Sequence, residues 1–168
     1  MTGRRAILIV PPAPDMIVVE RLRRRFDPLV QMIPAHVTLV FPFAAEISDD
    51  DLKRHLTTAM QRHRSFSFDL DGFRCTTDHV LFFNIGRGAD QVRELHHRLY
   101  TGPLGEFLSA QEFVPHVTVG RFATPSACDE AHKVVRGANL RVQTVASAIR
   151  VYGLDVEPYV VQIEVRWP

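Results

Sequence analysis

The tripeptide His-Val-Thr occurs twice in the chain, at residues 36–38 and again at residues 116–118. From the chain's content of these three amino acids, about 0.06 copies are expected by chance, so a random origin of both is disfavoured. The flanks agree as well. The stretches IPAHVTLVFPF and FVPHVTVGRF both carry a proline shortly before the histidine and a phenylalanine within six residues after it. Repetition with matching flanks predicts a duplicated structural unit.

Hydrophobic periodicity predicts the same order of elements in both halves of the chain: a short apolar strand, a helix, a proline-containing loop, an HVT strand and a capped helix. The expected strands are 6–10, 36–43, 66–73, 79–85, 116–122, 140–154 and 159–167, the last two paired around residues 157–158. The expected helices are 15–26, one that follows the N-cap Ser48, 90–100, and one from Pro125 to Gly137 after the N-cap Thr124.

This pattern predicts an α+β fold, built as two similar lobes whose mainly antiparallel sheets face a central groove. A chain of 168 residues is long enough to bury one good core, and no linker interrupts it. We therefore expect a single domain over residues 1–168, with approximate lobes at 1–75 and 76–168. Terminal strands that cross between the lobes are compatible with this expectation.

Composition narrows the class of protein. With 46% hydrophobic residues, 23% charged residues and a net charge of +1, the chain resembles a soluble globular protein. A near-neutral chain disfavours a protein that coats long nucleic acid with a basic face, although it permits a local basic pocket. No apolar segment approaches the length of a membrane span, and the run 6–10 is too short for a signal peptide. We expect a cytoplasmic protein that does not bind membranes.

Other conspicuous residues have ordinary interpretations. Cys75 and Cys128 show no metal or redox spacing and are interpreted as reduced cysteines of a cytosolic protein, with a single disulfide left open. The run RLRRR at 21–25 is interpreted as the solvated face of a helix. The histidines outside the two motifs, including the adjacent pair 96–97, lack companion metal ligands and are interpreted as surface or partly buried residues. No metal and no cofactor are expected.

The chemistry of the two motifs follows from the geometry of a strand. Successive side chains of a strand point to opposite faces, so His36 and Thr38 share one face. Val37 points the other way into the core, and the same alternation is expected for Leu39, Phe41 and Phe43. In the second motif, His116 and Thr118 share a face in the same manner. Each motif strand therefore presents an imidazole and a hydroxyl on one side and an apolar surface on the other.

Two duplicated lobes can bring these polar faces together across a cleft. An imidazole has an ordinary pKa of about 6.5 and is available in either protonation state near neutral pH. Two imidazoles beside one substrate can supply one general base and one general acid. The hydroxyls can donate hydrogen bonds to an oxyanion, for which a phosphate group is well suited. This set of groups predicts phosphoester cleavage by acid–base catalysis without a metal.

The paired His-x-Thr motifs, the PHVTVGR form of the second one and the duplicated strand–helix order resemble the 2H phosphoesterases. Within that superfamily the chain is most similar to the 2′-5′ RNA ligase and cyclic phosphodiesterase branch, and the resemblance covers nearly the whole chain. It implies a bilobal fold with a central groove and metal-independent cleavage of 2′,3′-cyclic or 2′-5′ phosphodiesters, reversible as ligation. It also implies that the catalytic residues are His36, Thr38, His116 and Thr118.

Three further residues are candidates for contact with a nucleotide or RNA-end substrate. Arg121 follows the second motif, where strict alternation turns it away from the catalytic face, but Gly120 would permit a bulge that re-aims it. Phosphate contact and a surface salt bridge are both open for this arginine. Phe43, like Phe41, and Tyr152 would be able to stack on a nucleobase, although phenylalanines are more typical of a core.

Two other functions compete with the phosphodiesterase. A non-catalytic RNA- or nucleotide-binding module would use the same groove, but binding alone does not need two titratable imidazoles. Metal-dependent hydrolysis is disfavoured because metal-ligand spacing is missing. Neither extended contact with nucleic acid nor a particular oligomeric state is predicted.

Overall fold

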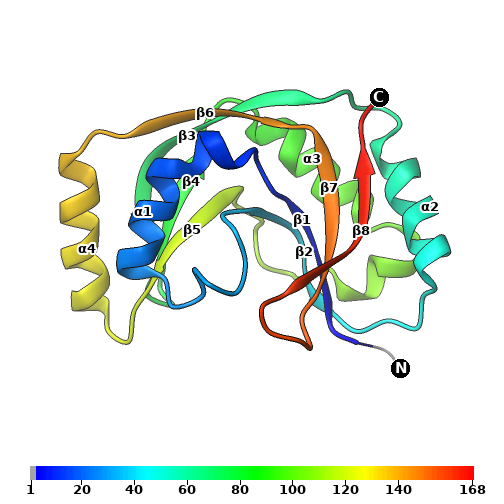
Figure 1. Ribbon diagram of the computed structural model, residues 1–168, viewed down its shortest axis with the longest axis horizontal. Coiled ribbons are helices and arrows are strands. Elements are labelled where there is room, and N and C mark those ends of the chain that lie inside the picture. Colours follow the sequence, from blue (N-terminus) through cyan, green and yellow to red (C-terminus); the bar gives the residue numbers. More distant parts are fainter. Residues whose placement is uncertain (1–2) are drawn as a thin grey trace.

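The fold is organised around one antiparallel sheet, which the computed structural model describes together with the rest of residues 3–168. Its eight strands follow the order β6-β3-β4-β5-β2-β1-β7-β8 and curl into a half-barrel (Figure 1). The strands are β1 (Arg5–Ile9), β2 (Val37–Phe43), β3 (Phe66–Cys75), β4 (Val80–Ile85), β5 (His116–Arg121), β6 (Arg141–Ala146), β7 (Ala148–Gly153) and β8 (Val160–Arg166). The expected α+β class with mainly antiparallel strands is confirmed.

The helices cover the two ends of the sheet. They are α1 (Ile17–Phe26), α2 (Asp49–Met60), α3 (Ala89–Leu99) and α4 (Pro125–Gly137), with two 3₁₀ segments, η1 (Ala13–Met16) and η2 (Gly102–Phe107). The expected N-caps are present: the Ser48 side chain accepts a hydrogen bond from the Asp51 amide, and the Thr124 side chain accepts one from the Ala127 amide. These caps fix where α2 and α4 begin.

The sheet consists of two four-stranded halves that meet at β5 and β2. These two strands pair only at Val37 and Val117, the middle residues of the two motifs. Helices α1 and α4 pack on the half that contains β3, β4 and β5, while α2 and α3 pack on the half that contains β2 and β8 (Figure 1). The two duplicated units therefore exchange helices. Helix α1, from the first half of the chain, covers β5, the motif strand of the second half. Helix α3, from the second half, covers β2, the motif strand of the first half.

The halves of the sheet do not coincide with the halves of the sequence. The expected boundary at 75 and 76 falls between β3 and β4, which pair with each other. The segment 140–154, expected to be one strand, is divided at Ser147 into β6, which pairs with β3, and β7, which pairs with β1. The chain thus crosses from one half to the other within this segment, and β8 follows as the expected antiparallel partner of β7.

The interpretation of the cysteines as reduced is wrong in this structure. Cys75 at the end of β3 and Cys128 in α4 form a disulfide, with their Cα atoms 6.2 Å apart. Their separation of 53 residues gave no spacing signal. The pairing arises because α4 packs against β3 and β4, and only the tertiary fold reveals it.

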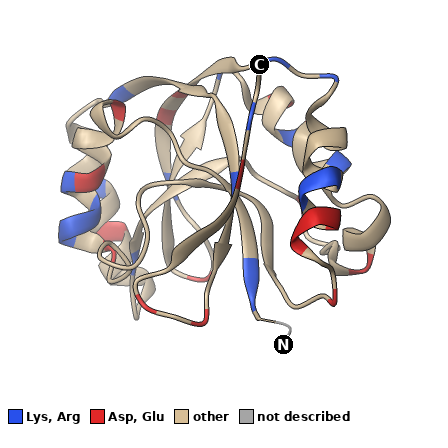
Figure 2. Cartoon of the chain, turned by 45° about the vertical axis from the view of Figure 1, so that its right-hand side comes forward, with Lys and Arg blue, Asp and Glu red and all other residues tan. Residues whose placement is uncertain are grey.

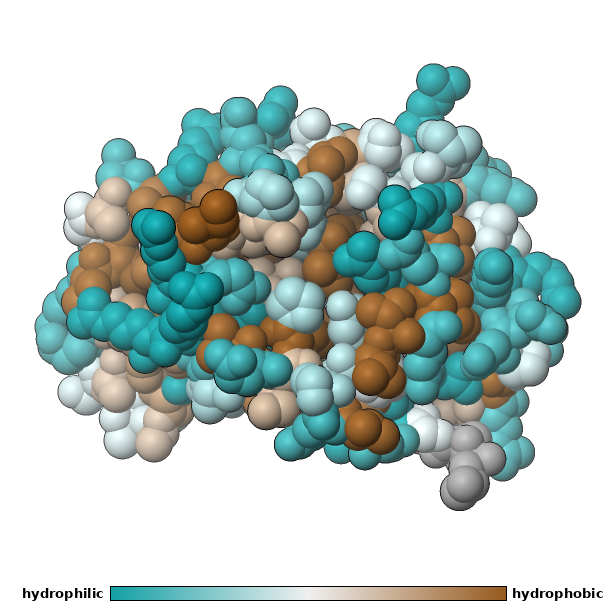
Figure 3. All heavy atoms as spheres, in the orientation of Figure 1, coloured by the Kyte–Doolittle hydropathy of each residue, from teal (hydrophilic) through white to brown (hydrophobic). Residues whose placement is uncertain are grey.

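Charged residues of both signs are interleaved on the outer surfaces of the helices (Figure 2). On the face seen in Figure 3, hydrophobic residues are visible along the middle between hydrophilic margins. Within residues 3–168, none of the helices combines the length and the apolar character that a membrane crossing requires.

Candidate active site

The two motifs lie side by side at the junction of the two halves of the sheet. In an antiparallel pair registered at Val37 and Val117, His36 is level with Thr118 and Thr38 is level with His116. Both valines are fully buried, whereas the four polar residues are only partly buried. Alternation therefore places both imidazoles and both hydroxyls on one face of the sheet, related by an approximate twofold axis through the valine pair.

A bulge follows each motif at the equivalent position. In the pairing of β1 with β2, Leu8 faces Thr38 and Ile7 faces Val40, so that Leu39 is skipped. In the pairing of β4 with β5, the same shift occurs between the pairs at residues 118 and 120. Each bulge reverses the alternation of the side chains that follow it.

These bulges determine the direction in which two side chains point. The second one turns Arg121 onto the face that carries His116 and Thr118, as a bulge near Gly120 would. The first one turns Phe41 outward, where it is 44% exposed and lines a cavity, so the expectation of an inward Phe41 is wrong. Gly120 has a packing role, because an added Cβ would lie 2.9 Å from the Cβ atom of Phe26 in α1.

Both motif histidines have the same tautomer-fixing contact. The Nδ1 atom of His36 lies 2.8 Å from the Pro34 carbonyl oxygen, and the Nδ1 atom of His116 lies 2.6 Å from the Val114 carbonyl oxygen. A neutral ring that donates its Nδ1–H to a carbonyl carries its lone pair on Nε2. Each ring therefore presents Nε2 as a proton acceptor, and the backbone carbonyl favours the imidazolium once Nε2 is protonated.

The surroundings of both rings disfavour a positive charge. Burial lowers the pKa of His36 to about 4, and the positive charges of Arg23 and Arg121 add to this effect, opposed by the Pro34 carbonyl and by Asp27. Burial likewise lowers the pKa of His116 to about 4, with further contributions from His36, Arg74 and Arg121. Both imidazoles are neutral at pH 7 in the free protein, and an anion between them would favour protonation.

The lowered pKa values predict a loss of stability in acid that belongs to these two rings. In the unfolded chain each imidazole takes up a proton at its ordinary pKa of 6.5, whereas the folded protein resists until about pH 4. Stability contributed by the neutral rings is therefore complete above pH 6.5 and falls as the pH decreases toward 4. In urea unfolding, the variant with both histidines replaced by alanine should lose less stability over this range than the unmodified protein.

The buried Val119 in β5 provides the control for this measurement, because its truncation lowers stability without removing a titratable group. Val119→Ala should leave the pH dependence of the unfolding free energy as it is in the unmodified protein. An equal loss of stability in the double variant and the unmodified protein would show that burial does not hold the two motif rings neutral.

A cavity of about 610 Å³ opens beside the second motif and is large enough for a nucleotide, whereas His36 and Thr38 are not among the residues that line it. At one end its wall includes His116, Thr118 and Arg121, with Arg74 close to them. At the other end the wall is largely aromatic and is formed by Phe41, His96, Tyr100, Phe107 and Phe113. The cavity thus joins a polar, cationic region beside the second motif to an apolar one.

The aromatic end exists because β2 and β5 diverge beyond their single pair. The edge of β2 that β5 leaves open is satisfied by α3 and the residue after it: the Phe41 amide donates to the Tyr100 hydroxyl at 3.0 Å, and His96 Nδ1 lies 2.7 Å from the Leu39 carbonyl oxygen. The His96 ring stacks on Phe113 with centroids 3.7 Å apart. Burial lowers the pKa of His96, so this ring is also neutral.

Two of the residues expected to touch substrate lie elsewhere. Phe43 is buried in the main core, where its ring packs against Phe107. Tyr152 is buried in a second, smaller hydrophobic cluster with Ala6, Leu8 and Ile33. Neither side chain lines the cavity. At Tyr152 and Gly153, β7 still pairs with both β1 and β8.

Sequence reasoning missed two neighbours of His116. Phe82 on β4 stacks on the His116 ring with centroids 3.3 Å apart, and the guanidinium of Arg74 on β3 lies 5.8 Å from the centre of the Phe82 ring. Cross-strand register brings them together, since Phe82 is paired with both Thr118 and Arg74. Period-two alternation in 79–85 was a usable signal for Phe82, whereas nothing local distinguished Arg74.

The family model described as the 2′-5′ RNA ligase superfamily matches residues 10–156 of the chain. The chain belongs to this superfamily, that of the 2H phosphoesterases. Among its relatives, a Bacillus licheniformis protein named "Putative phosphoesterase" is 28% identical over 136 residues, which cover 78% of this chain and 76% of that one. A Halalkalibacterium halodurans protein of the same name is 30% identical over 124 residues and 68% of each chain.

Solved structures agree on the fold of this 2H phosphoesterase. Escherichia coli LigT in complex with 3′-AMP has a TM-score of 0.64 at 17% identity, and 99% of both chains is covered. LigT in complex with ATP has a TM-score of 0.62 at 16% identity over the same shares. As for metals, residues 3–168 contain no cluster of three or more histidine, cysteine or acidic side chains placed to hold an ion.

Proposed function

We propose that this 2H phosphoesterase cleaves 2′,3′-cyclic or 2′-5′ phosphodiester bonds of nucleotides or RNA ends, with 2′-5′ ligation as the reverse reaction. The observation that carries the proposal is the pair of motif histidines. Both have Nδ1 bound to a backbone carbonyl, and both stand on the same face beside the valine pair that joins the two halves of the sheet. Such an arrangement supplies one proton acceptor and one proton donor to a single phosphate between them.

In the proposed reaction, Nε2 of one histidine removes a proton from water, whose oxygen attacks phosphorus. The bond from phosphorus to the ribose oxygen breaks, and the second histidine, protonated, gives its proton to that oxygen. Thr38, Thr118 and Arg121 hold the phosphate oxygens, on which negative charge increases in the transition state. The bound phosphodiester anion offsets the burial that lowers the imidazole pKa values, so one ring can carry the proton that the reaction needs.

The two ends of the cavity give the substrate a direction. The aromatic end can stack a nucleobase, as aromatic side chains do in proteins that bind single-stranded nucleic acid. On the motif strands this end lies beyond Thr38 and His116, on the side away from His36. A nucleoside bound there places its ribose oxygen nearer His116, so we assign His116 as the acid and His36 as the base. A substrate with a good leaving group should then rescue His116→Ala and not His36→Ala.

A panel of 2′,3′-cyclic nucleotides, RNA with 2′,3′-cyclic ends and 2′-5′ dinucleotides tests the proposal. With products resolved by chromatography and phosphorus NMR, we expect turnover of at least one class to a monoester or to its component nucleotides. Excess chelator should leave the rate unchanged, because the groups proposed to hold phosphate are hydroxyls, imidazoles and a guanidinium. Loss of activity in chelator with recovery on adding Mg²⁺ would overturn the metal-free mechanism. Nucleotide binding without any turnover would favour the non-catalytic module.

A further inference from the structure

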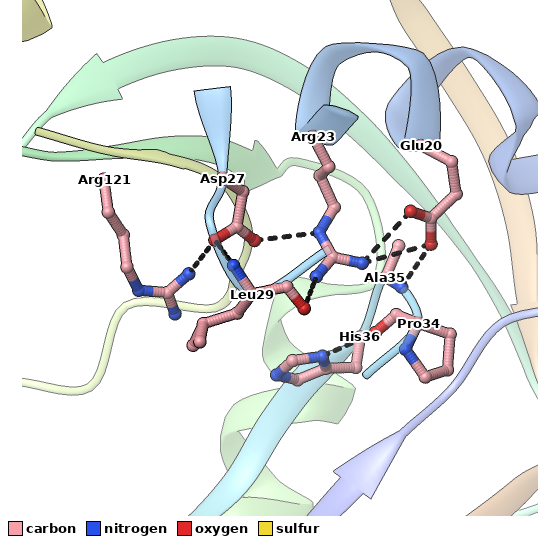
Figure 4. A network of polar contacts seen from close by, with 8 residues as sticks. All are labelled: Glu20, Arg23, Asp27, Leu29, Pro34, Ala35, His36 and Arg121. Carbon is pink, nitrogen blue, oxygen red and sulfur yellow. Dashed lines mark hydrogen bonds and ion pairs between the residues drawn. The ribbon is translucent and has the colours of Figure 1, made fainter. Parts of the chain in front are cut away.

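A chain of charged groups, buried at Arg23 and Asp27, connects the segment before the first motif to the arginine that follows the second motif (Figure 4). It runs from Glu20 to Arg23 at 3.1 Å, from Arg23 to Asp27 at 3.0 Å, and from Asp27 to Arg121 at 2.6 Å. The first three residues belong to α1 and the residue that follows it, whereas Arg121 ends β5. The signs alternate along the chain, so each carboxylate lies beside a guanidinium.

The Glu20 end of this chain holds the segment that leads into the first motif. The Ala35 amide donates a hydrogen bond to Glu20 Oε1 at 2.5 Å. The next residue is His36, and its Nδ1 is bound to the carbonyl of Pro34 on the other side of Ala35. The position of the His36 ring therefore depends on a short turn that Glu20 fixes from behind.

The Asp27 end of this chain holds Arg121, the arginine that follows the second motif. Oδ1 of Asp27 accepts from Arg121 Nη1, and it also accepts from the Leu29 amide at 3.0 Å. The Asp27 side chain is only 1% exposed, so its charge is fixed in place, whereas the Arg121 side chain is 35% exposed and lines the cavity. One edge of the guanidinium is anchored, and its remaining N–H groups are available to an anion.

Arg23 is the element that joins the two ends. Its side chain is 1% exposed, and it reaches Glu20, Asp27 and the Leu29 carbonyl. The expectation that the run 21–25 is a solvated helix face holds for Arg21, Arg24 and Arg25 but is wrong for Arg23. Its burial follows from α1 packing on β5, which turns one side of that helix inward.

At the equivalent place in the other half, the contact is uncharged. Phe41 stands five residues after His36, as Arg121 stands five residues after His116, and its amide is held by the Tyr100 hydroxyl. Buried ion pairs contribute little net stability because desolvation offsets their attraction. Tyr100 follows α3 as Asp27 follows α1, and it holds a backbone amide with a neutral hydroxyl where Asp27 holds a guanidinium with a charge. The charged version is therefore better explained by what it does to His36 and Arg121.

We propose that Glu20, Arg23 and Asp27 are positioning residues of the phosphodiesterase reaction: through one buried guanidinium they set the first-motif histidine and the second-motif arginine at a fixed separation around the phosphate. The inference rests on the proposed function. The two ends act on different steps, because Asp27 acts through Arg121 on phosphate binding and Glu20 acts through His36 on proton transfer. Arg23 affects both.

Variants separate these roles. Asp27→Asn should raise KM and the Kd of inorganic phosphate about tenfold, and Glu20→Gln should lower kcat about tenfold with little change in the Kd of phosphate, since small displacements of a catalytic group are costly. In an Arg121→Met background, Asp27→Asn should change the Kd of phosphate by less than about twofold, because the group through which it acts is gone. Arg23→Met should show both defects, and Arg23→Lys should restore neither fully, since an ammonium lacks the planar fork.

The control is Asp69, a side chain that is 1% exposed and bound to both Arg87 and Arg141 at 2.8 Å on the same half of the sheet, away from the cavity. Asp69→Asn should lower the melting temperature as Asp27→Asn does, without changing kcat, KM or the Kd of phosphate. Equal kinetic effects of Asp69→Asn and Asp27→Asn would overturn the proposal and leave the charged chain with a structural role only.

Calorimetric titration with inorganic phosphate keeps this test independent of turnover. If no substrate is turned over but Asp27→Asn weakens phosphate binding only when Arg121 is present, the proposed activity fails and the positioning role for phosphate stands. If substrate is turned over and the effects of Asp27→Asn and Arg121→Met on the Kd of phosphate simply add, the activity stands and the positioning role fails. Absence of phosphate binding by the unmodified protein would also contradict the role assigned to Arg121.

Discussion

Replacing His36 or His116 by alanine is expected to lower kcat about 10²–10⁴-fold on a substrate that the unmodified protein turns over, the usual range for loss of a general acid or base. Each ring has Nδ1 bound to a backbone carbonyl and Nε2 left as its proton acceptor, so each replacement removes one of the two proposed proton transfers. If the rings act as a unit, the double variant should be only slightly slower than either single variant. Steady-state and single-turnover rates of the three variants measure this directly.

The pH dependence gives the same mechanism a second test. Burial, together with nearby positive charges, holds the pKa of both rings at about 4 in the free protein. The productive form with one neutral and one protonated ring is then most populated in acid, so kcat/KM should decrease as the pH rises toward neutrality. The bound phosphodiester anion raises these pKa values, so kcat should have its optimum at a higher pH than kcat/KM. The apparent pKa values on the acidic and basic sides of each pH profile belong to the pair of histidines and not to either residue alone.

Stability and a surface control distinguish a chemical defect from misfolding. The motif rings are partly exposed and sit outside the main core, so both alanine variants should unfold cooperatively with little loss of stability at pH 7. His97→Ala, on an exposed part of α3, should keep full activity. Full activity of His36→Ala would contradict the two-histidine mechanism and leave the repeated motif as a structural relic of duplication.

Local patterns in the sequence were enough to predict the elements that carry the motifs. Alternation around Val37 and Val117 identified which side chains are buried, and the caps Ser48 and Thr124 fixed the starts of two helices. These features depend on residues a few positions apart, which is why sequence reasoning reaches them. The duplication then predicted the antiparallel α+β class and brought the two motifs together as one candidate site.

What sequence reasoning missed depends on partners that are distant in the chain. The bulge that turns Phe41 onto the face of the motif histidines arises in the pairing of β1 with β2. The burial of Arg23 depends on α1 covering a strand from the other half of the chain. The disulfide likewise joins α4 to β3. None of these contacts leaves a periodic signal, because each is decided by tertiary packing.

The structure also shows how a duplicated unit becomes directional. The histidines and threonines repeat almost symmetrically about the valine pair, but the position five residues after each histidine differs. Arg121, held by Asp27, makes one end cationic, whereas Phe41 is anchored by its amide to Tyr100 in an aromatic surround. This arrangement suits the proposed phosphodiester substrate, because its two ester oxygens are bonded to phosphorus in the same way and differ only in the groups that they carry.

Thr38→Ala or Thr118→Ala is expected to lower kcat about 10²–10³-fold, the loss typical of one well-placed donor to a transition-state oxyanion. Each hydroxyl is level with the histidine of the other motif, so a phosphate between the rings lies between the hydroxyls as well. Thr→Ser keeps the hydroxyl and removes only a methyl group, so the serine variants should retain most of the activity. Val119→Ala in β5 is the packing control, since that buried side chain points away from the site. Its truncation should lower the free energy of unfolding and leave kcat nearly unchanged. If serine and alanine were equally harmful at positions 38 and 118 while both variants stayed folded, the methyl groups rather than the hydroxyls would be what the motifs preserve, and the phosphate would have to be held by Arg121 and the imidazoles alone.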